Sequence, residues 1–227
     1  MPVEPHSRPP AYPRVRPVGE TAFTVEFGDR VNADLNRRVH ALDALLEDAS
    51  LAGIVERVPT YRSLLVIFDP LSTDSVALQT ELLRLAGGEL TESPLAPGRL
   101  IEIPVRYGGN DGPDLGDVAT HCRLTPADVI AQHAAVTYQV AMLGFTPGFT
   151  YLLGLSPALA TPRLATPRLQ VPPGSIGIAG SQTGIYALST PGGWRIIGRT
   201  PLLLFDPNRD KPFLVEAGDR VRFVVDD

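Results

Sequence analysis

The sequence predicts an α+β protein with two domains, an N-terminal α+β domain over residues 18–98 and a C-terminal β-barrel domain over residues 99–227. Three observations predict this organisation. Runs with strand and helix periods alternate through the first hundred residues. The segment from Leu90 to Gly98 is rich in Pro and Gly and lacks periodicity, which is typical of a linker. From Tyr138 onward, short β-prone runs alternate with Pro and Gly clusters, the pattern of a closed or nearly closed antiparallel barrel.

Residues 1–17 are expected to form a disordered or extended tail. They contain six prolines and three arginines, but no apolar run that could serve as the core of a signal peptide. We therefore expect these residues to be dispensable for folding.

The N-terminal domain is predicted to follow the order β-α-β-β-α. Phe23, Val25 and Phe27 alternate with polar residues, as in a half-buried strand. Ser72 or Thr73 is expected to cap the second helix. The expected elements are a strand over 23–27, an amphipathic helix over 35–46, strands over 53–58 and 63–68, and a helix that ends at 87–88.

The second domain is predicted to begin with a strand over residues 100–106. A short helix follows, with Thr125 as its N-cap, Pro126 at the first helical position and Asp128 placed favourably for the helix dipole. Residues 159–168 repeat the sequence Leu-Ala-Thr-Pro-Arg twice, which favours an extended backbone.

The composition excludes several classes of partner and compartment. A net charge of −5 gives no basic surface for nucleic acid, and no apolar run approaches the roughly 20 residues that span a bilayer. Cys122 is the only cysteine, so no intramolecular disulfide can form and a reducing cytoplasm is expected. We predict neither nucleic acid nor a membrane as partner.

Several catalytic motifs are also missing from the sequence. A phosphate-binding P-loop needs a lysine in a Gly-rich context, but Lys211, the only lysine, lies between Asp210 and Pro212. No Gly-x-Ser-x-Gly elbow of a serine hydrolase is present. The four histidines show no metal-ligand spacing, so no metal site is predicted.

Three stretches carry the candidate site: residues 144–151, 171–186 and 190–201. The first places aromatic residues on both sides of a Pro-Gly turn and predicts the wall of a pocket. The second supplies backbone amides, hydroxyls and a carboxamide at turns that glycine opens to close approach.

These stretches resemble a family that contains the first component of allophanate hydrolase, the kinase inhibitor KipI and the B component of 5-oxoprolinase. The resemblance runs from about Tyr107 through Phe223 and is weaker in the N-terminal half. It implies that the C-terminal barrel is cyclophilin-like. Small departures occur at Thr150, Ser156, Pro173 and Ser181, where the family more often has Pro, Asp, Ala and Gly.

The resemblance implies three alternative functions. The favoured one is a component of an ATP-dependent 5-oxoprolinase, which opens the cyclic amide 5-oxoproline to glutamate together with partners similar to the A and C components of that enzyme. ATP would then be a co-substrate with Mg²⁺. The alternatives are an inhibitor that docks on a sensor histidine kinase, as KipI does, and a component related to allophanate hydrolase or urea carboxylase. A prolyl isomerase is disfavoured, because the match is to this separate family.

The candidate site residues fall into two groups, and each has a structural alternative. His133 could be a packed helix residue, the aromatic residues could pack the barrel, and the arginines could cap loop carbonyls. The predicted catalytic residues are His133, Gln182 and Arg199. The predicted substrate- or nucleotide-binding residues are Phe145, Pro147, Phe149, Tyr151, Arg163, Arg168, Gly174, Ser175, Gln182, Thr183, Tyr186, Gly192, Gly193 and Trp194.

Overall fold

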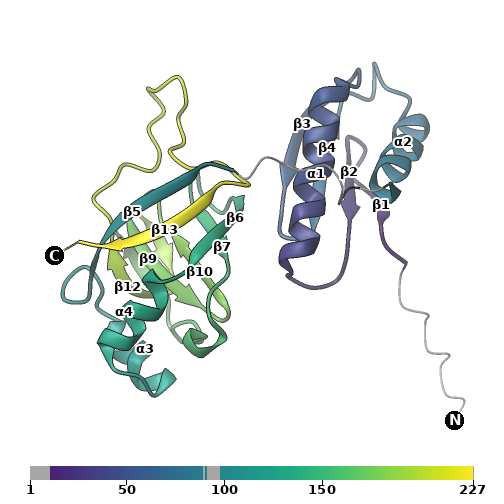
Figure 1. Cartoon of the computed structure of the whole chain (residues 1–227). Coiled ribbons are helices and arrows are strands. Elements are labelled where there is room, and N and C mark those ends of the chain that lie inside the picture. The colour runs from purple at the N-terminus through teal and green to yellow at the C-terminus, as the bar shows by residue number, and fades with distance from the viewer. Residues whose placement is uncertain (1–10, 89, 91–97, 227) are drawn as a thin grey trace, which may run out of the picture. The chain divides into compact units, whose positions relative to one another are not determined.

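The computed structural model describes residues 11–88, 90 and 98–226. The chain divides into two compact units, residues 1–93 and 94–227, each with its own core (Figure 1). The division falls in the Pro-rich segment in which the sequence placed a linker, five residues before the expected boundary at 98. The linker itself lies mostly outside the described residues.

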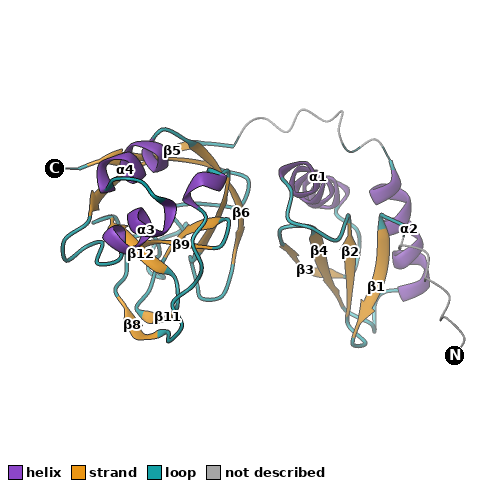
Figure 2. Cartoon of the chain, turned by 90° about the horizontal axis from the view of Figure 1, so that it is seen from below, coloured by secondary structure: helices purple, strands orange, loops and turns teal. Residues whose placement is uncertain are grey.

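The first unit is a four-stranded antiparallel sheet in the order β1-β2-β4-β3. Its core lies between the helices and one face of this sheet, because alternate strand residues such as Val25 and Leu64 pack with Leu42 and Leu82 of the helices (Figure 2). The strands are β1 (Arg14–Val18), β2 (Ala22–Glu26), β3 (Ile54–Pro59) and β4 (Ser63–Phe68), and the helices are α1 (Ala33–Ala49) and α2 (Ser75–Gly87). The predicted β-α-β-β-α elements are confirmed, with β1 added before them.

Strand β1 corrects the predicted tail, because residues 14–17 belong to the sheet. Arg14 pairs with Glu26 across the strands, and Pro17 lies opposite Phe23. The prolines suggested that no strand could form here. Proline is tolerated in β1 because this is the edge strand of the sheet, where a missing N–H costs no ladder bond on the solvent side.

The cap of α2 is also different from the prediction. Asp74 is the N-cap, and its carboxylate accepts hydrogen bonds from the backbone N–H groups of Val76 and Ala77 at 2.9 and 3.1 Å. The Ser72 hydroxyl instead donates to the Asp69 carboxylate at 3.0 Å. A carboxylate at the helix N-terminus also interacts favourably with the helix dipole.

The second unit is a closed seven-stranded barrel in the order β10-β7-β6-β13-β5-β12-β9. All neighbouring pairs are antiparallel except β13 and β5, which are parallel. A two-stranded ribbon, β8 and β11, lies beside the barrel (Figure 2). The barrel strands are β5 (Leu100–Tyr107), β6 (Thr137–Leu143), β7 (Thr150–Leu153), β9 (Ser175–Ala179), β10 (Gln182–Ile185), β12 (Arg195–Arg199) and β13 (Arg220–Val225), and the ribbon strands are β8 (Arg168–Val171) and β11 (Thr190–Gly192).

The helices of the second unit are short. Helix α4 (Pro126–Ala134) begins as predicted, because Thr125 and Asp128 form a reciprocal capping box with Pro126 in the first turn. Helix α3 (Leu115–Cys122) was not predicted, since its eight residues follow a Gly-rich segment and show little periodicity. A 3₁₀ turn, η1 (Pro157–Leu159), completes the unit.

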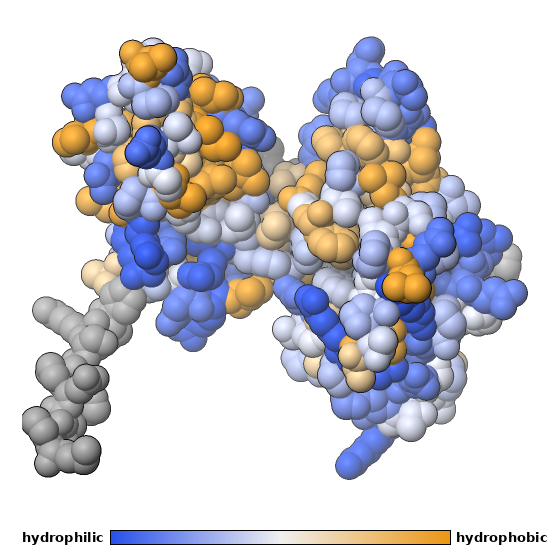
Figure 3. Space-filling view, turned by 180° about the vertical axis from the view of Figure 1, so that it is seen from behind, coloured by the Kyte–Doolittle hydropathy of each residue, from blue (hydrophilic) through white to orange (hydrophobic). Residues whose placement is uncertain are grey.

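None of the helices in the described part of the chain is long and apolar enough to cross a bilayer. In the view from behind, apolar patches are separated by hydrophilic ones on each unit (Figure 3).

Removing β1 is expected to destabilise the first unit. Deletion of residues 1–18 would expose the edge of β2 and remove the half-buried side chain of Val15 from the core, so thermal melting should show a fall of about 5–15 °C, since about 1 kcal/mol corresponds to about 4–8 °C in a domain of this size. Deletion of residues 1–10 is the matched control and should leave the melting temperature unchanged. Equal melting temperatures for the two deletions would contradict a structural role for β1.

Candidate functional site

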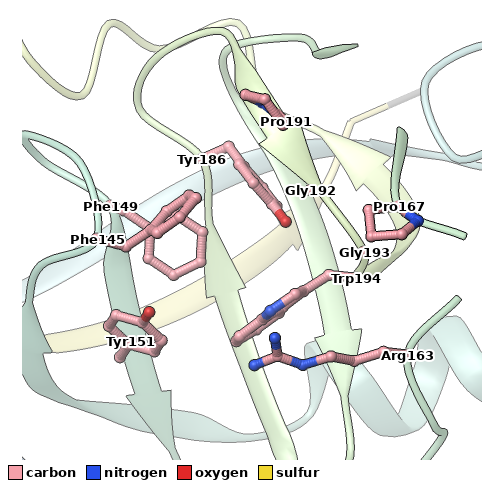
Figure 4. A pocket seen from close by; sticks show the side chains of 10 residues that line it. All are labelled: Phe145, Phe149, Tyr151, Arg163, Pro167, Tyr186, Pro191, Gly192, Gly193 and Trp194. Atoms are coloured by element: carbon pink, nitrogen blue, oxygen red, sulfur yellow. The ribbon is translucent and has the colours of Figure 1, made fainter. Parts of the chain in front are cut away.

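A pocket of about 260 Å³ opens on the second unit, beside the β8–β11 ribbon (Figure 4). Its walls come from the turn before β7, the repeated segment 159–168, the end of β10 and the segment around β11. The residues that line it are Phe145, Phe149, Tyr151, Arg163, Pro167, Tyr186, Pro191, Gly192, Gly193 and Trp194. The three stretches that the sequence singled out therefore meet here.

Phe149 is the centre of the aromatic wall. Its ring centroid lies 4.6 Å from that of Tyr151, 4.8 Å from that of Tyr186 and 5.4 Å from that of Trp194. Several of these contacts are edge-to-face, an arrangement that fixes aromatic rings relative to one another. With Val171, Ala179 and Ile196, these rings form a small core of their own beside the barrel core. The aromatic residues therefore pack a small core and also form a wall of the pocket.

Two glycines allow the rings to come this close to the backbone. A Cβ atom at Gly192 would lie 2.4 Å from the Tyr186 hydroxyl oxygen, and one at Gly184 would lie 2.7 Å from the carbonyl oxygen of Thr150. Both distances are far below van der Waals contact. The glycine at position 192 therefore lets the Tyr186 hydroxyl pack directly against the backbone at the pocket wall.

Phe145 forms the lip of the pocket. Its side chain is 65% exposed and its ring packs edge-on against Phe149 with a centroid distance of 5.7 Å. Its backbone has φ = 65°, a left-handed conformation that is unfavourable for a bulky residue. Backbone conformations of this kind cluster at ligand-binding and active sites.

The segment 159–168 is fastened to the rest of the unit by a buried carboxylate. Asp114 accepts a hydrogen bond from Arg168 Nη2 at 2.6 Å and another from the backbone N–H of Ile196 at 2.6 Å. The backbone N–H of Leu164 also donates to the carbonyl of Gly193 at 2.8 Å. These bonds place Arg163 and Pro167 at the pocket.

The three predicted arginines have different surroundings. Arg168 forms an ion pair with the buried Asp114, and Arg199 lies 3.6 Å from Asp111 on the β5 side of the barrel; neither lines the pocket. Arg163 does line it, with its guanidinium carbon 5.9 Å from the centre of the Trp194 ring. Of the three, only Arg163 therefore fits a role at the pocket; Arg168 was also predicted to bind a ligand, and Arg199 was predicted to be catalytic.

The two pocket tyrosines remain protonated at neutral pH. Burial raises the pKa of Tyr186 and that of Tyr151 above the ordinary value of 10, although the positive charge of Arg163 opposes the shift at both. Their hydroxyl groups are therefore hydrogen-bonding groups and not bases.

His133 lies outside the pocket, in the centre of the barrel unit. It is fully buried, its ring stacks on Phe223 at 4.6 Å, and Tyr138 donates a hydrogen bond to its carbonyl at 2.9 Å. The Thr183 hydroxyl donates to the carbonyl of Gly177 at 3.0 Å, so it must accept from His133 Nε2, which is 3.0 Å away. Nδ1 of His133 then accepts from the Tyr107 hydroxyl at 2.8 Å.

This chain of hydrogen bonds fixes one neutral tautomer of the imidazole. Burial lowers the pKa of His133 to about 3, in keeping with a neutral ring at physiological pH. The geometry supports the alternative of a packed helix residue and gives no support to a role for His133 in acid–base catalysis. Thr183, predicted to bind ligand, belongs to the same interior network.

The remaining predicted residues also lie away from the pocket. Gln182 begins β10 opposite Ala179, Pro147 is exposed on the turn before β7, and Ser175 is buried in β9. Gly174 is a turn residue, because a Cβ there would lie 2.2 Å from the carbonyl oxygen of Thr200. The sequence missed Pro167 as a lining residue, although the Leu-Ala-Thr-Pro-Arg repeat marked its segment, and it included Pro191 only within the candidate stretch 190–201. Among the described residues, no group of three or more His, Cys, Asp or Glu side chains could hold a metal ion.

Comparison with known proteins places the chain among close relatives. Residues 13–215 match the family model described as carboxyltransferase domain, subdomain C and D. The chain is 43% identical over 223 residues to the B component of 5-oxoprolinase from Bacillus subtilis (strain 168), covering 93% of this chain and 92% of that protein. It is 46% identical over 207 residues to the B component of 5-oxoprolinase from Escherichia coli O157:H7, covering 91% and 93%.

Solved structures share the fold. The structure of TTHA0988 has a TM-score of 0.79 and 40% identity over 91% of this chain, which spans only 40% of that longer chain. The urea amidolyase of K. lactis has a TM-score of 0.73 over 93% of this chain and 15% of that chain. At 21% identity, this second likeness concerns the fold alone.

The buried imidazole is expected to make the fold sensitive to mild acid. The folded pKa of about 3 is below the ordinary value of 6.5, so below pH 6.5 the unfolded chain binds a proton that the folded chain does not. The contribution of His133 is fully present above pH 6.5 and falls by up to about 1.4 kcal/mol per pH unit as the pH drops toward about 3. His133→Gln, which cannot titrate, should show a flatter pH dependence of unfolding free energy in denaturant titrations.

His121→Gln is the matched control for that measurement, because His121 is an exposed histidine of α3. Its pH dependence should follow that of the wild type. If His133→Gln and the wild type lose stability equally in acid, the assignment of a neutral, buried imidazole to His133 is wrong.

Arg168→Ala should destabilise the protein more than Arg163→Ala. The change at Arg168 leaves the buried Asp114 carboxylate without its ion-pair partner, and losses of about 3–5 kcal/mol are typical of fully buried pairs. Because the Arg168 side chain is 31% exposed, we expect a loss of about 1–3 kcal/mol. Arg163→Ala should change the unfolding free energy by less than about 0.5 kcal/mol, and similar losses in the two variants would refute this assignment.

Proposed function

The chain belongs to the carboxyltransferase domain family, subdomain C and D, and we propose that it is one component of an ATP-dependent 5-oxoprolinase that opens 5-oxoproline to glutamate. The observation that carries the proposal is the match to proteins named as the B component of 5-oxoprolinase, at 43% and 46% identity over more than nine-tenths of both chains. The proposed partners are two proteins similar to the A and C components of that enzyme.

The proposed reaction explains why ATP is needed. An unactivated lactam is a poor electrophile, since its nitrogen donates electron density to the carbonyl carbon. Transfer of the γ-phosphoryl group to the amide oxygen releases ADP and converts that oxygen into a leaving group. One water then adds to the activated carbon and the ring nitrogen leaves as the amine, which breaks the C–N bond and gives an acyl phosphate. A second water hydrolyses this acyl phosphate to glutamate and inorganic phosphate.

The lining of the pocket supports a shared site over a complete one. It offers aromatic rings, one guanidinium and two protonated tyrosine hydroxyls, but the lining residues include no carboxylate, histidine, serine or cysteine. These groups can bind and orient a ligand and exclude water around it. They are not suited to hold Mg²⁺, which prefers carboxylate oxygens. The proposal therefore assigns ATP and its Mg²⁺ to a site that the partner proteins complete.

The other functions implied by the sequence have weaker support. The likeness to urea amidolyase concerns the fold alone, and so it does not favour urea or allophanate as substrate. Docking on a histidine kinase needs no pocket of this kind. We keep kinase inhibition as an outcome of the experiment.

The purified chain alone is expected to show no 5-oxoproline-dependent ATPase. Activity should appear when the A-like and C-like proteins are added. ADP and glutamate release should be measured for each protein singly and for every combination, with and without 5-oxoproline. Coupled release of both products by the full mixture alone is the expected result, because only then is the shared site complete.

Two outcomes would overturn the proposal. Turnover by this chain alone would contradict a shared site. No turnover in any mixture, together with tight binding to a sensor histidine kinase, would favour the inhibitor.

A further inference from the structure

We propose that the aromatic pocket binds the ring substrate itself, a compact cyclic amide with a carboxylate, and that Arg163 recognises the carboxylate. The choice of 5-oxoproline as this ligand rests on the proposed function. The position of the site in the pocket rests on the geometry of the second unit.

Arg163 forms no ion pair with any residue in the described part of the chain, whereas Arg168 and Arg199 each face an aspartate. Arg163 lies instead over the ring of Trp194, where the guanidinium retains donors for a ligand (Figure 4). An arginine held at the mouth of an aromatic pocket without an acidic partner fits an anionic ligand.

The pocket is small and is lined mainly by aromatic rings. Tyr151, Phe149 and Trp194 pack against one another at tilted or edge-on angles of 57–80°, so together they form one continuous aromatic wall against which a ring can lie (Figure 4). The volume of about 260 Å³ is below the roughly 300–1,000 Å³ of pockets for drug-sized ligands. A five-membered lactam is compact enough for this space.

The charge of the pocket fits the ring substrate better than the nucleotide. A triphosphate carries several negative charges, and sites for it usually combine several cations or backbone amides with Mg²⁺. The lining of this pocket has one guanidinium. A single carboxylate matches that charge, and a triphosphate does not.

Two tyrosines of the pocket lining offer hydroxyl groups toward the amide end of the ligand. The hydroxyls of Tyr186 and Tyr151 stay protonated because burial raises their pKa, so they do not repel an anion. Tyr186 lines the pocket although it is almost fully buried, and its hydroxyl packs against Gly192, where any Cβ would collide with it. The proposal therefore directs the lactam end of the ligand toward the Tyr186 side of the pocket and the carboxylate toward Arg163.

The test uses the fluorescence of Trp194, which is the only tryptophan of the chain and lines the pocket. The full-length protein is titrated with 5-oxoproline, with pyrrolidin-2-one, which lacks the carboxylate, and with ATP. We expect saturable quenching by 5-oxoproline and none by ATP. Arg163→Gln should weaken 5-oxoproline binding by about 10- to 100-fold, the loss typical of one charge-assisted hydrogen bond, and leave pyrrolidin-2-one binding unchanged.

Two further variants control for charge and for geometry. Arg30→Gln removes the same charge from an exposed site in the first unit and should bind 5-oxoproline as the wild type does. Arg163→Lys should restore part of the lost affinity, because lysine keeps the charge but lacks the planar pair of donors. Melting temperatures of the Arg163 variants should equal that of the wild type.

The same variants in the reconstituted complex separate this inference from the proposed function. If the complex opens 5-oxoproline and Arg163→Gln raises its KM about 10- to 100-fold, the inference stands even where the isolated chain binds weakly. An unchanged KM, or quenching by ATP in place of 5-oxoproline, would overturn the inference and leave the function intact. Absence of turnover in every mixture would instead count against the proposed function.

Discussion

The barrel unit depends on one buried imidazole whose two nitrogens are both satisfied. Through His133, the chain of hydrogen bonds from Tyr107 to Gly177 connects α4 to β5, β10 and β9. Stacking on Phe223 adds β13 to this node. A buried polar group costs free energy unless all of its hydrogen-bonding atoms have partners. Full pairing also specifies one structure, because each partner must occupy one position. These hydrogen bonds therefore hold β10 from inside the barrel, and β10 leads directly into Tyr186 of the pocket wall.

The sequence predicted the fold well where the signal was local. Alternation in β2, the capping box at Thr125 and the Pro-Gly punctuation of the barrel each depend on neighbours a few residues apart. The prediction from the sequence failed where an element depends on a partner from another part of the chain. Strand β1 exists because β2 lies beside it, and its prolines alone argued against a strand.

The candidate site divides in the same way. The aromatic wall could be predicted because Phe145, Phe149 and Tyr151 are close in the sequence and surround one turn. The arginines could not be ranked, because Asp114, the partner of Arg168, is 54 residues away. The role of His133 was ambiguous for the same reason: helical spacing shows that a residue faces inward, but it cannot show whether the inner face is a core or a pocket.

The backbone at Gly192 contributes part of the pocket wall, and this limits how the site can change during evolution. A pocket bounded by side chains can be enlarged or reduced by single substitutions that retain the fold. Here the Tyr186 hydroxyl lies where any other residue at 192 would place its first carbon, so substitution must displace the tyrosine or the strand. Selection for a different ligand would therefore have to begin elsewhere, at the exposed Phe145 or the segment that carries Arg163, whose side chains can vary without moving the backbone.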